Sequence, residues 1–237
     1  MKFLHIRQTS YSVISGLMLL LTAWGCGSSD SKTESASATS ALKSAETKSA
    51  TTAKKPIVLF YGNSLTAGYG VEPSQAFPAL VGQKIDSAGL NFQVVNAGLS
   101  GETTAGGKSR ISWVMRQPVA VFVLELGGND GLRGIPLKST RQNLQAIIDT
   151  VRLKSPQATI VLAGMQIPPN LGTDYTREFR GLFKELADKN KLVLIPFLLE
   201  GVGGIPKLNQ PDGIHPTPAG HKIVAKTVWK VLQPVLQ

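Results

Sequence analysis

The sequence predicts an α/β fold: a single-domain three-layer sandwich in which a five-stranded parallel sheet carries helices on both faces. Two observations support this prediction. From Pro56 onward, short apolar runs rich in β-branched residues alternate with segments that have the apolar spacing of a helix. The runs are continuously apolar, which is typical of parallel strands that are covered on both faces. Strands that alternate with helices in this way join into one parallel sheet.

The expected strands are five apolar runs. They lie at residues 56–61, 92–96, 119–126, 158–164 and 191–197. A helix with apolar residues spaced three and four apart is predicted from Leu144, Ile147, Ile148 and Val151. The last segment repeats the spacing at Val224, Val228 and Val231. We find no internal repeat and no sign of a second folded domain.

A strand order of 2-1-3-4-5 is expected for this sheet, and it reverses the direction of winding between strands 1 and 3. Ligands of such sheets bind beyond the carboxyl ends of the strands at this switch point. The loops that would meet there read "GNSLTAGYG" (62–70) and "GGNDGLRG" (127–134). We therefore expect the functional site at this edge of the sheet.

Two segments are predicted to precede the domain. Residues 1–25 combine a short basic start with an apolar stretch that is too short to span a bilayer comfortably, as in an export signal. Residues 26–55 are nearly all Ser, Ala, Thr and Lys, and such a segment predicts a flexible tether. The folded domain is then expected to be residues 56–237.

The single cysteine of the chain, Cys26, follows the apolar stretch directly. The segment "LTAWGC" resembles the lipobox of bacterial lipoproteins, in which the chain is cut before a cysteine that then carries lipid. The resemblance implies a lipid anchor on Cys26, although Trp24 is bulkier than the residue usual next to the cut. The alternative is an incidental cysteine in an ordinary signal. Gly27, in place of an Asp that retains many lipoproteins at the inner membrane, favours the outer membrane, facing the periplasm or the cell surface.

The net charge of +10 raises the question of a nucleic-acid partner. The domain itself holds 18 basic and 12 acidic residues, spread along the helices without a basic run interleaved with aromatics. This pattern argues against nucleic-acid binding. With one cysteine in the chain, the domain has no disulfide and no thiolate metal site. We expect a monomer that needs no metal and no organic cofactor.

A possible catalytic constellation comes from three residues. Ser64 begins the turn after the first strand, and Asp212 precedes His215 by three residues in "PDGIHPTPAGH". A carboxylate beside an imidazole fixes its tautomer and stabilises the imidazolium that forms when it takes a proton. The alternative is a capping Asp beside a surface His. His221, in the final helix, is expected to cap or to be solvated.

Two further residues are candidates for oxyanion donors. Asn129 follows a buried strand and two glycines, so its amide could donate to a developing negative charge. A turn Asn that satisfies its own backbone is the alternative. Gly101, in "GLSGETTAGG" after the second strand, could offer its backbone N–H. Arg133 of "GLRG" could contact a substrate or brace its loop.

From Pro56 to the C-terminus the chain resembles the SGNH (GDSL) hydrolase superfamily, most closely its bacterial arylesterase, acyl thioesterase and lysophospholipase branch. Four blocks match in order: "YGNSLTAGYG", "NAGLSGET", "LELGGNDGLRG" and "DGIHP". The resemblance implies that Ser64 is the nucleophile, His215 the base and Asp212 its orienting acid. It implies an oxyanion hole made by the Ser64 N–H, the Gly101 N–H and the Asn129 side chain.

The resemblance also implies a substrate. The loop that starts with Met165, Gln166, Ile167 and Pro168 resembles the segment that lines the acyl site in this branch. We expect a serine esterase that acts on aryl or short-to-medium acyl esters, with lysophospholipids and thioesters as further candidates. An exported enzyme does not meet cytosolic acyl-CoA, which favours oxygen esters. A polysaccharide O-deacetylase and a catalytically silent acyl- or glycan-binding lipoprotein are the alternatives.

A phosphate-loop interpretation of "GETTAGGKS" (101–109) fails on spacing, because five residues instead of four separate Gly101 from Gly107.

One residue departs from the resembled family: Asn63 stands where that family usually has Asp. Asn keeps a side-chain acceptor of the same size and adds an NH₂ donor. We therefore interpret Asn63 as a tolerated variant, and expect Asn63→Asp to change activity modestly.

Overall fold

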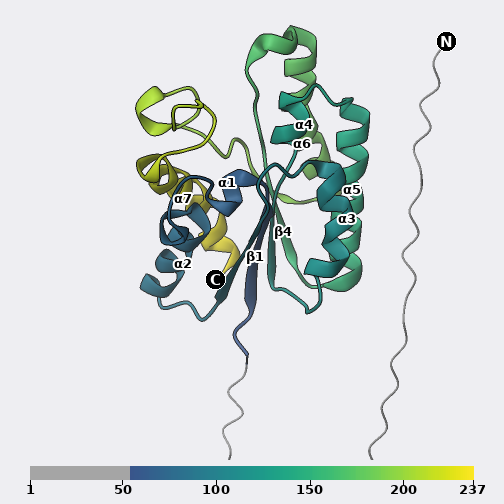
Figure 1. The fold of residues 1–237 in the computed structure, drawn as a ribbon. Coiled ribbons are helices and arrows are strands. Elements are labelled where there is room, and N and C mark those ends of the chain that lie inside the picture. The colour runs from purple at the N-terminus through teal and green to yellow at the C-terminus, as the bar shows by residue number, and fades with distance from the viewer. Residues whose placement is uncertain (1–53) are drawn as a thin grey trace, which may run out of the picture. The chain divides into compact units, whose positions relative to one another are not determined.

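The computed structural model describes residues 54–237, and these residues form a five-stranded parallel sheet with helices on both faces (Figure 1). The order of strands across the sheet is β2-β1-β3-β4-β5. Both the α/β class and the strand order predicted from the sequence are therefore confirmed. The predicted signal peptide, Cys26 and all but the last two residues of the predicted tether lie outside the described residues.

Each strand overlaps the apolar run that predicted it. The strands are β1 (Ile57–Gly62), β2 (Gln93–Gly98), β3 (Val121–Glu125), β4 (Thr159–Ala163) and β5 (Val193–Ile195). The α-helices are α1 (Ser64–Ala67), α2 (Phe77–Ser87), α3 (Thr104–Val114), α4 (Gly128–Leu132), α5 (Leu137–Lys154), α6 (Thr173–Asn190) and α7 (Pro218–Leu232). Single 3₁₀ turns lie at Pro73–Gln75, Pro169–Leu171, Pro206–Leu208 and Gln233–Val235.

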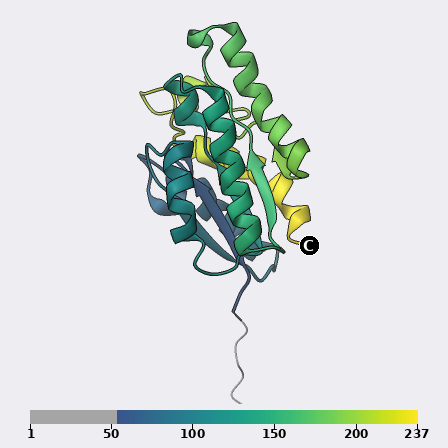
Figure 2. The same cartoon turned by 90° about the vertical axis from the view of Figure 1, so that its right-hand side faces the viewer.

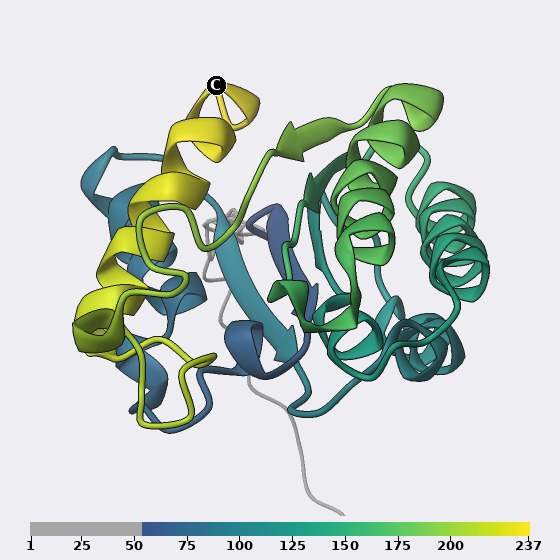
Figure 3. The ribbon, with the colours of Figure 1, turned by 90° about the horizontal axis from the view of Figure 1, so that it is seen from above.

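The helices form two layers around the sheet. Helices α2 and α7 pack together on one face, and α3, α5 and α6 pack side by side on the other (Figure 3). Figure 2 looks onto the second layer and shows its helices covering that face. No helix within residues 54–237 is both long enough and apolar enough to cross a membrane.

Burial differs between the central and the edge strands. All six residues of β1 and all five of β3 are buried, as their continuous apolarity predicts. Strand β2 is half-buried, with exposed residues among its six, because it lies at the edge of the sheet and has a neighbour on one side only. The prediction that every strand is covered on both faces is therefore correct for the centre of the sheet and not for this edge.

The helical spacing of α5 is confirmed, since Leu144, Ile147, Ile148 and Val151 are all fully buried. In α7 the buried stripe differs at its end: Leu232 is fully buried, whereas Val231 is half-buried. Leu232 follows Val228 by four residues, which keeps it on the same face of the helix.

The glycine-rich stretch 101–109 has a packing role in α3. The carbonyl of Gly107 accepts a hydrogen bond from the Tyr61 hydroxyl at 2.6 Å. A Cβ on Gly107 would overlap the end of the Leu126 side chain, so glycine lets α3 pack closely against Leu126. Gly107 therefore serves the packing of α3, which agrees with the absence of a phosphate-loop spacing.

Candidate active site

Ser64 lies at the first position of α1, directly beyond the carboxyl end of the central strand β1. Asn63 caps this helix: its Oδ1 accepts a hydrogen bond from the Leu65 N–H at 2.9 Å. A Cβ on Gly62 would overlap the Thr66 hydroxyl and the Glu125 carboxylate, so the strand must end in glycine for the turn to form. The turn thus holds Ser64 at the switch point expected from the strand order.

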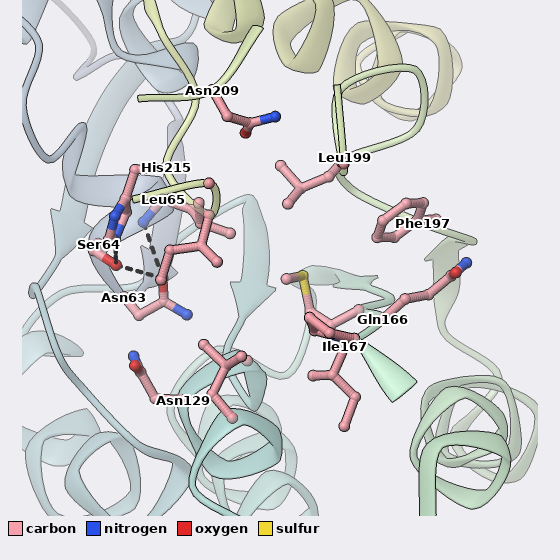
Figure 4. Close-up of a pocket in the computed structure, with 18 residues that line it drawn as sticks. Asn63, Ser64, Leu65, Asn129, Gln166, Ile167, Phe197, Leu199, Asn209 and His215 are labelled. Atoms are coloured by element: carbon pink, nitrogen blue, oxygen red, sulfur yellow. Dashed lines mark hydrogen bonds between the residues drawn. The ribbon is translucent and has the colours of Figure 1, made fainter. Parts of the chain in front are cut away.

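His215 approaches Ser64 from the loop that precedes α7. The distance from His215 Nε2 to Ser64 Oγ is 2.8 Å (Figure 4), and His215 Nδ1 lies 2.7 Å from Asp212 Oδ2. The structure therefore brings together the three residues that the sequence singled out. Because a carboxylate can only accept, Nδ1 carries the proton, and Nε2 is free to accept from the serine hydroxyl.

The Asp212 carboxylate is held by its own loop as well as by the imidazole. Its Oδ1 accepts from the backbone N–H groups of Ile214 and His215, each at 3.0 Å. Partial burial acts to raise the pKa of Asp212, but the hydrogen bonds from the His215 side chain and from these two N–H groups outweigh it and hold the pKa below its usual range. The Asp212 carboxylate is therefore ionised at neutral pH, where it can orient the imidazole.

Asn129 lies on the opposite side of Ser64 from His215 (Figure 4), and the residue that it contacts, Glu102, directly follows Gly101. Asn129, in α4, has its amide end directed toward Ser64 (Figure 4), and its Nδ2 also donates to the Glu102 carbonyl at 3.0 Å. This bond uses one of two N–H groups and leaves the other for a ligand. Gly101 has a φ of 79°, which favours glycine, and its carbonyl accepts from the Arg133 guanidinium at 3.2 Å. Arg133 thus braces this loop.

A mostly apolar cavity of about 370 Å³ opens beside Ser64 (Figure 4). The four residues expected from the sequence, Met165, Gln166, Ile167 and Pro168, all line it. The other apolar side chains of its wall are Leu65, Leu132, Phe197, Leu199 and Ile214. Because Ser64, Asn129 and His215 also line this cavity, an acyl chain held in it would have its carbonyl at the serine.

Three parts of the site were not predicted from the sequence. The Tyr69 ring packs against the His215 ring with centroids 4.7 Å apart. Phe197 and Leu199 follow β5, which ends at Ile195. The predicted strand extended to residue 197, so Phe197 was assigned to the strand and not to the site. Glu125 ends β3 and lies under the serine turn, where it accepts a hydrogen bond from Asn63 Nδ2 at 2.7 Å. A charged residue at the end of an otherwise apolar strand was the available signal for Glu125.

His221 differs from the expectation that it caps a helix or is solvated. It is fully buried, its Nδ1 accepts from the Phe77 N–H at 3.3 Å, and its ring stacks on that of Phe77. Burial, with a smaller contribution from the charge of His215, lowers the pKa of His221 to about 4. The side chain is therefore a neutral packing residue between α2 and α7.

No group of three His, Cys, Asp or Glu side chains within residues 54–237 is arranged to hold a metal ion.

Comparison with known proteins gives consistent matches over the described fold. Residues 60–223 match the model of the GDSL-like lipase/acylhydrolase family. The chain is 39% identical over 180 residues to "Esterase TesA" of Pseudomonas aeruginosa, covering 76% of this chain and 89% of that protein. It is 38% identical over 180 residues to "Thioesterase 1/protease 1/lysophospholipase L1" of Escherichia coli, covering 76% and 84%. A crystal structure of TesA superposes with a TM-score of 0.73 at 39% identity, covering 76% of this chain and 99% of that one.

Proposed function

Because the chain belongs to the GDSL-like lipase/acylhydrolase family and is a serine esterase, we propose that it cleaves medium-chain carboxylic esters through an acyl-enzyme on Ser64. The observation that carries this proposal is the Ser64–His215–Asp212 chain of hydrogen bonds at the mouth of an apolar cavity. The bonds supply an activated nucleophile, and the cavity supplies a place for an acyl chain.

In the first half of the proposed reaction, Ser64 attacks the ester carbonyl while His215 Nε2 takes the hydroxyl proton. Asp212 stabilises the imidazolium that results, because its carboxylate already bonds to Nδ1. The protonated Nε2 then gives its proton to the leaving alcohol oxygen. The product of this half is an ester between Ser64 and the acyl group.

The negative charge that develops on the carbonyl oxygen needs donors on the side of Ser64 away from the base. The free N–H of the Asn129 amide, the Ser64 N–H and the Gly101 N–H are the groups available in these loops. In the second half, water attacks the acyl carbonyl while His215 takes its proton. His215 then gives this proton to Ser64 Oγ as the acyl–oxygen bond breaks and the carboxylic acid leaves. Every step uses side chains and backbone groups of this chain alone.

The size of the cavity supports a medium acyl chain over an acetyl group. Liquid water occupies about 30 Å³ per molecule, so 370 Å³ gives room for about a dozen groups of that size. An acetyl group would leave most of this space empty. The leucine, isoleucine, methionine and phenylalanine side chains of the wall also suit an alkyl chain better than a sugar, which disfavours the polysaccharide deacetylase.

The test is hydrolysis of p-nitrophenyl esters with acyl chains from two to twelve carbons. We expect kcat/KM to rise with chain length up to a medium chain, because each buried methylene adds about 0.8 kcal/mol of transfer free energy. The matched control is Ser64→Ala, which should lose turnover on every ester. A maximum at the two-carbon ester would favour the deacetylase, and no turnover at all from folded protein would favour the silent binder.

We also propose that the enzyme is exported and anchored by lipid on Cys26 in the outer membrane. The support is the sequence of residues 1–27 alone, with its apolar stretch, its single cysteine and the glycine that follows. Such a location favours oxygen esters, including lysophospholipids, over acyl-CoA. The test is metabolic labelling with a palmitate analogue, which should label the wild-type chain and not Cys26→Ser; equal labelling of both would contradict the anchor.

A further inference from the structure

Glu125 is a buried carboxylate directly beneath the turn that carries Ser64. It is the last residue of β3, it pairs in register with Gly62, and it is 1% exposed. Its Oε1 accepts from Asn63 Nδ2 at 2.7 Å. Its Oε2 accepts from the Asn63 backbone N–H at 3.1 Å and from the Thr66 hydroxyl at 2.7 Å. Both oxygens of the carboxylate are therefore bound to the segment that contains the nucleophile.

The groups around Glu125 are neutral hydrogen-bond donors. Burial raises its pKa to about 7, and the hydrogen bonds from Thr66 and Asn63 oppose that rise; no charged side chain contributes. Tyr61 of β1 is on the opposite face of the sheet, where it bonds to the α3 backbone. His221 of α7 pairs with a backbone N–H of α2. Donors alone suit an ionised carboxylate, which can only accept.

The Asn63 amide has a single orientation that satisfies both of its neighbours. Its Nδ2 must face Glu125, which accepts, and its Oδ1 must face the Leu65 N–H, which donates. If the Glu125 oxygen facing Asn63 carried a hydrogen, the amide would have to flip to accept from it. The flipped amide would then direct Nδ2 at the Leu65 N–H, two donors would oppose each other, and the cap of α1 would be lost.

We propose that Glu125 is a positioning residue for the nucleophile: its buried carboxylate orients Asn63, and Asn63 in turn holds the first turn of α1 and Ser64 in line with His215. This inference rests on the proposed function, since it assigns Ser64 as the nucleophile. It also explains the residue at position 63. An aspartate there would put a second carboxylate against Glu125 Oε1, and the two would have to share a proton. Asn63 carries the needed N–H permanently.

The experiment is a reciprocal exchange of the two side chains in the full-length chain. In Glu125→Gln, the glutamine NH₂ group must face either the Asn63 NH₂ group or the Asn63 backbone N–H, so two donors oppose each other in both orientations. We expect kcat to fall roughly 10- to 100-fold while KM changes less than about threefold. In the double variant Asn63→Asp with Glu125→Gln, the introduced glutamine amide can donate to the introduced aspartate and still accept from Thr66 and the backbone. Every hydrogen bond is then restored, and kcat should return to within about fivefold of wild type.

Two more readouts separate positioning from a general loss of structure. Asn63→Asp alone should be active near neutral pH, where the two carboxylates share a proton, and should lose activity at alkaline pH, where that proton leaves. The double variant should not show this alkaline loss. The matched control Glu185→Gln removes the same charge from an exposed site on α6 and should leave kcat and the pH profile unchanged.

The proposal is overturned if Glu125→Gln keeps kcat within about threefold of wild type, or if the double variant is no more active than Glu125→Gln. It is also overturned if Asn63→Asp and wild type have the same alkaline limb. Failure of the proposed function has a different signature, because turnover would then survive in Ser64→Ala. The positioning role is refuted only by Ser64-dependent turnover that does not respond to the exchange.

Discussion

Replacing Glu125 by Gln should change how the stability of the fold depends on pH. The ordinary pKa of this carboxyl is 4.5, and burial raises it to about 7 in the folded chain. The folded state therefore holds the proton more tightly than the unfolded state does. Stability from this group is fully present below pH 4.5 and is lost as the pH rises through 7. Linkage gives a loss of about 2 to 3 kcal/mol in the free energy of unfolding between pH 5 and pH 8.

The variant lacks this ionisation, so it should not share the loss. We expect the free energy of unfolding of Glu125→Gln, minus that of wild type, to increase by about 2 to 3 kcal/mol from pH 5 to pH 8. Any pH-independent cost of the altered hydrogen bonds cancels in this comparison, as do all other titrating groups. The assay is urea unfolding followed by circular dichroism at four pH values, with Glu185→Gln as the control for an exposed site. A difference that stays constant within about 0.5 kcal/mol would refute the buried, titrating carboxylate.

Four other changes test separate parts of the account. Asn129→Ala should lower kcat about 10²- to 10³-fold with little change in KM, as for other oxyanion donors, and a loss under about threefold would remove Asn129 from that role. Asp212→Asn should lower kcat by up to about 10⁴-fold, because an amide no longer fixes the His215 tautomer; unchanged kcat would contradict this. Ile167→Trp should shift the preferred p-nitrophenyl ester to a shorter acyl chain by filling the cavity, and an unchanged chain-length profile would show that the chain lies elsewhere. Burial lowers the pKa of His221 from 6.5 to about 4, so protonation of this side chain destabilises the folded state. The free energy of unfolding of wild type should therefore fall by about 3 kcal/mol between pH 7 and pH 4 relative to that of His221→Gln. If the free energies of the two proteins changed in parallel with pH, the burial of His221 in its neutral form would be contradicted.

The order of the strands and the meeting of the functional loops could be predicted because they follow from general rules. Continuous apolar runs predicted the central strands, and the switch point of a doubly wound sheet predicted that the loops after β1 and β3 meet. Ser64 and Asn129 were singled out because each lies in the loop that follows a buried strand. Asp212 and His215 were found because three residues of separation allow one turn to join them.

The remaining parts of the site depend on contacts between distant segments. Phe197 lines the cavity and lies two residues after β5, a strand of three residues. The apolar run that predicted this strand also includes Phe197, and it gave no sign of where the strand ends. His221 has the polar chemistry of a capping or surface residue, and only the packing of α7 against α2 makes it a buried acceptor for the Phe77 N–H. Position 63 can be understood only from its partner: the choice of Asn follows from the Glu125 carboxylate, which is 62 residues away in the chain.

Reaction with a fluorophosphonate tests whether Ser64 is an activated nucleophile. The full-length chain and its Ser64→Ala variant would be treated in parallel, and intact mass and peptide mass spectra recorded. We expect one phosphonyl group per wild-type chain, attached at Ser64, and none on the variant. Folded wild-type protein that acquires no adduct, or that acquires one equally in the variant, would contradict it.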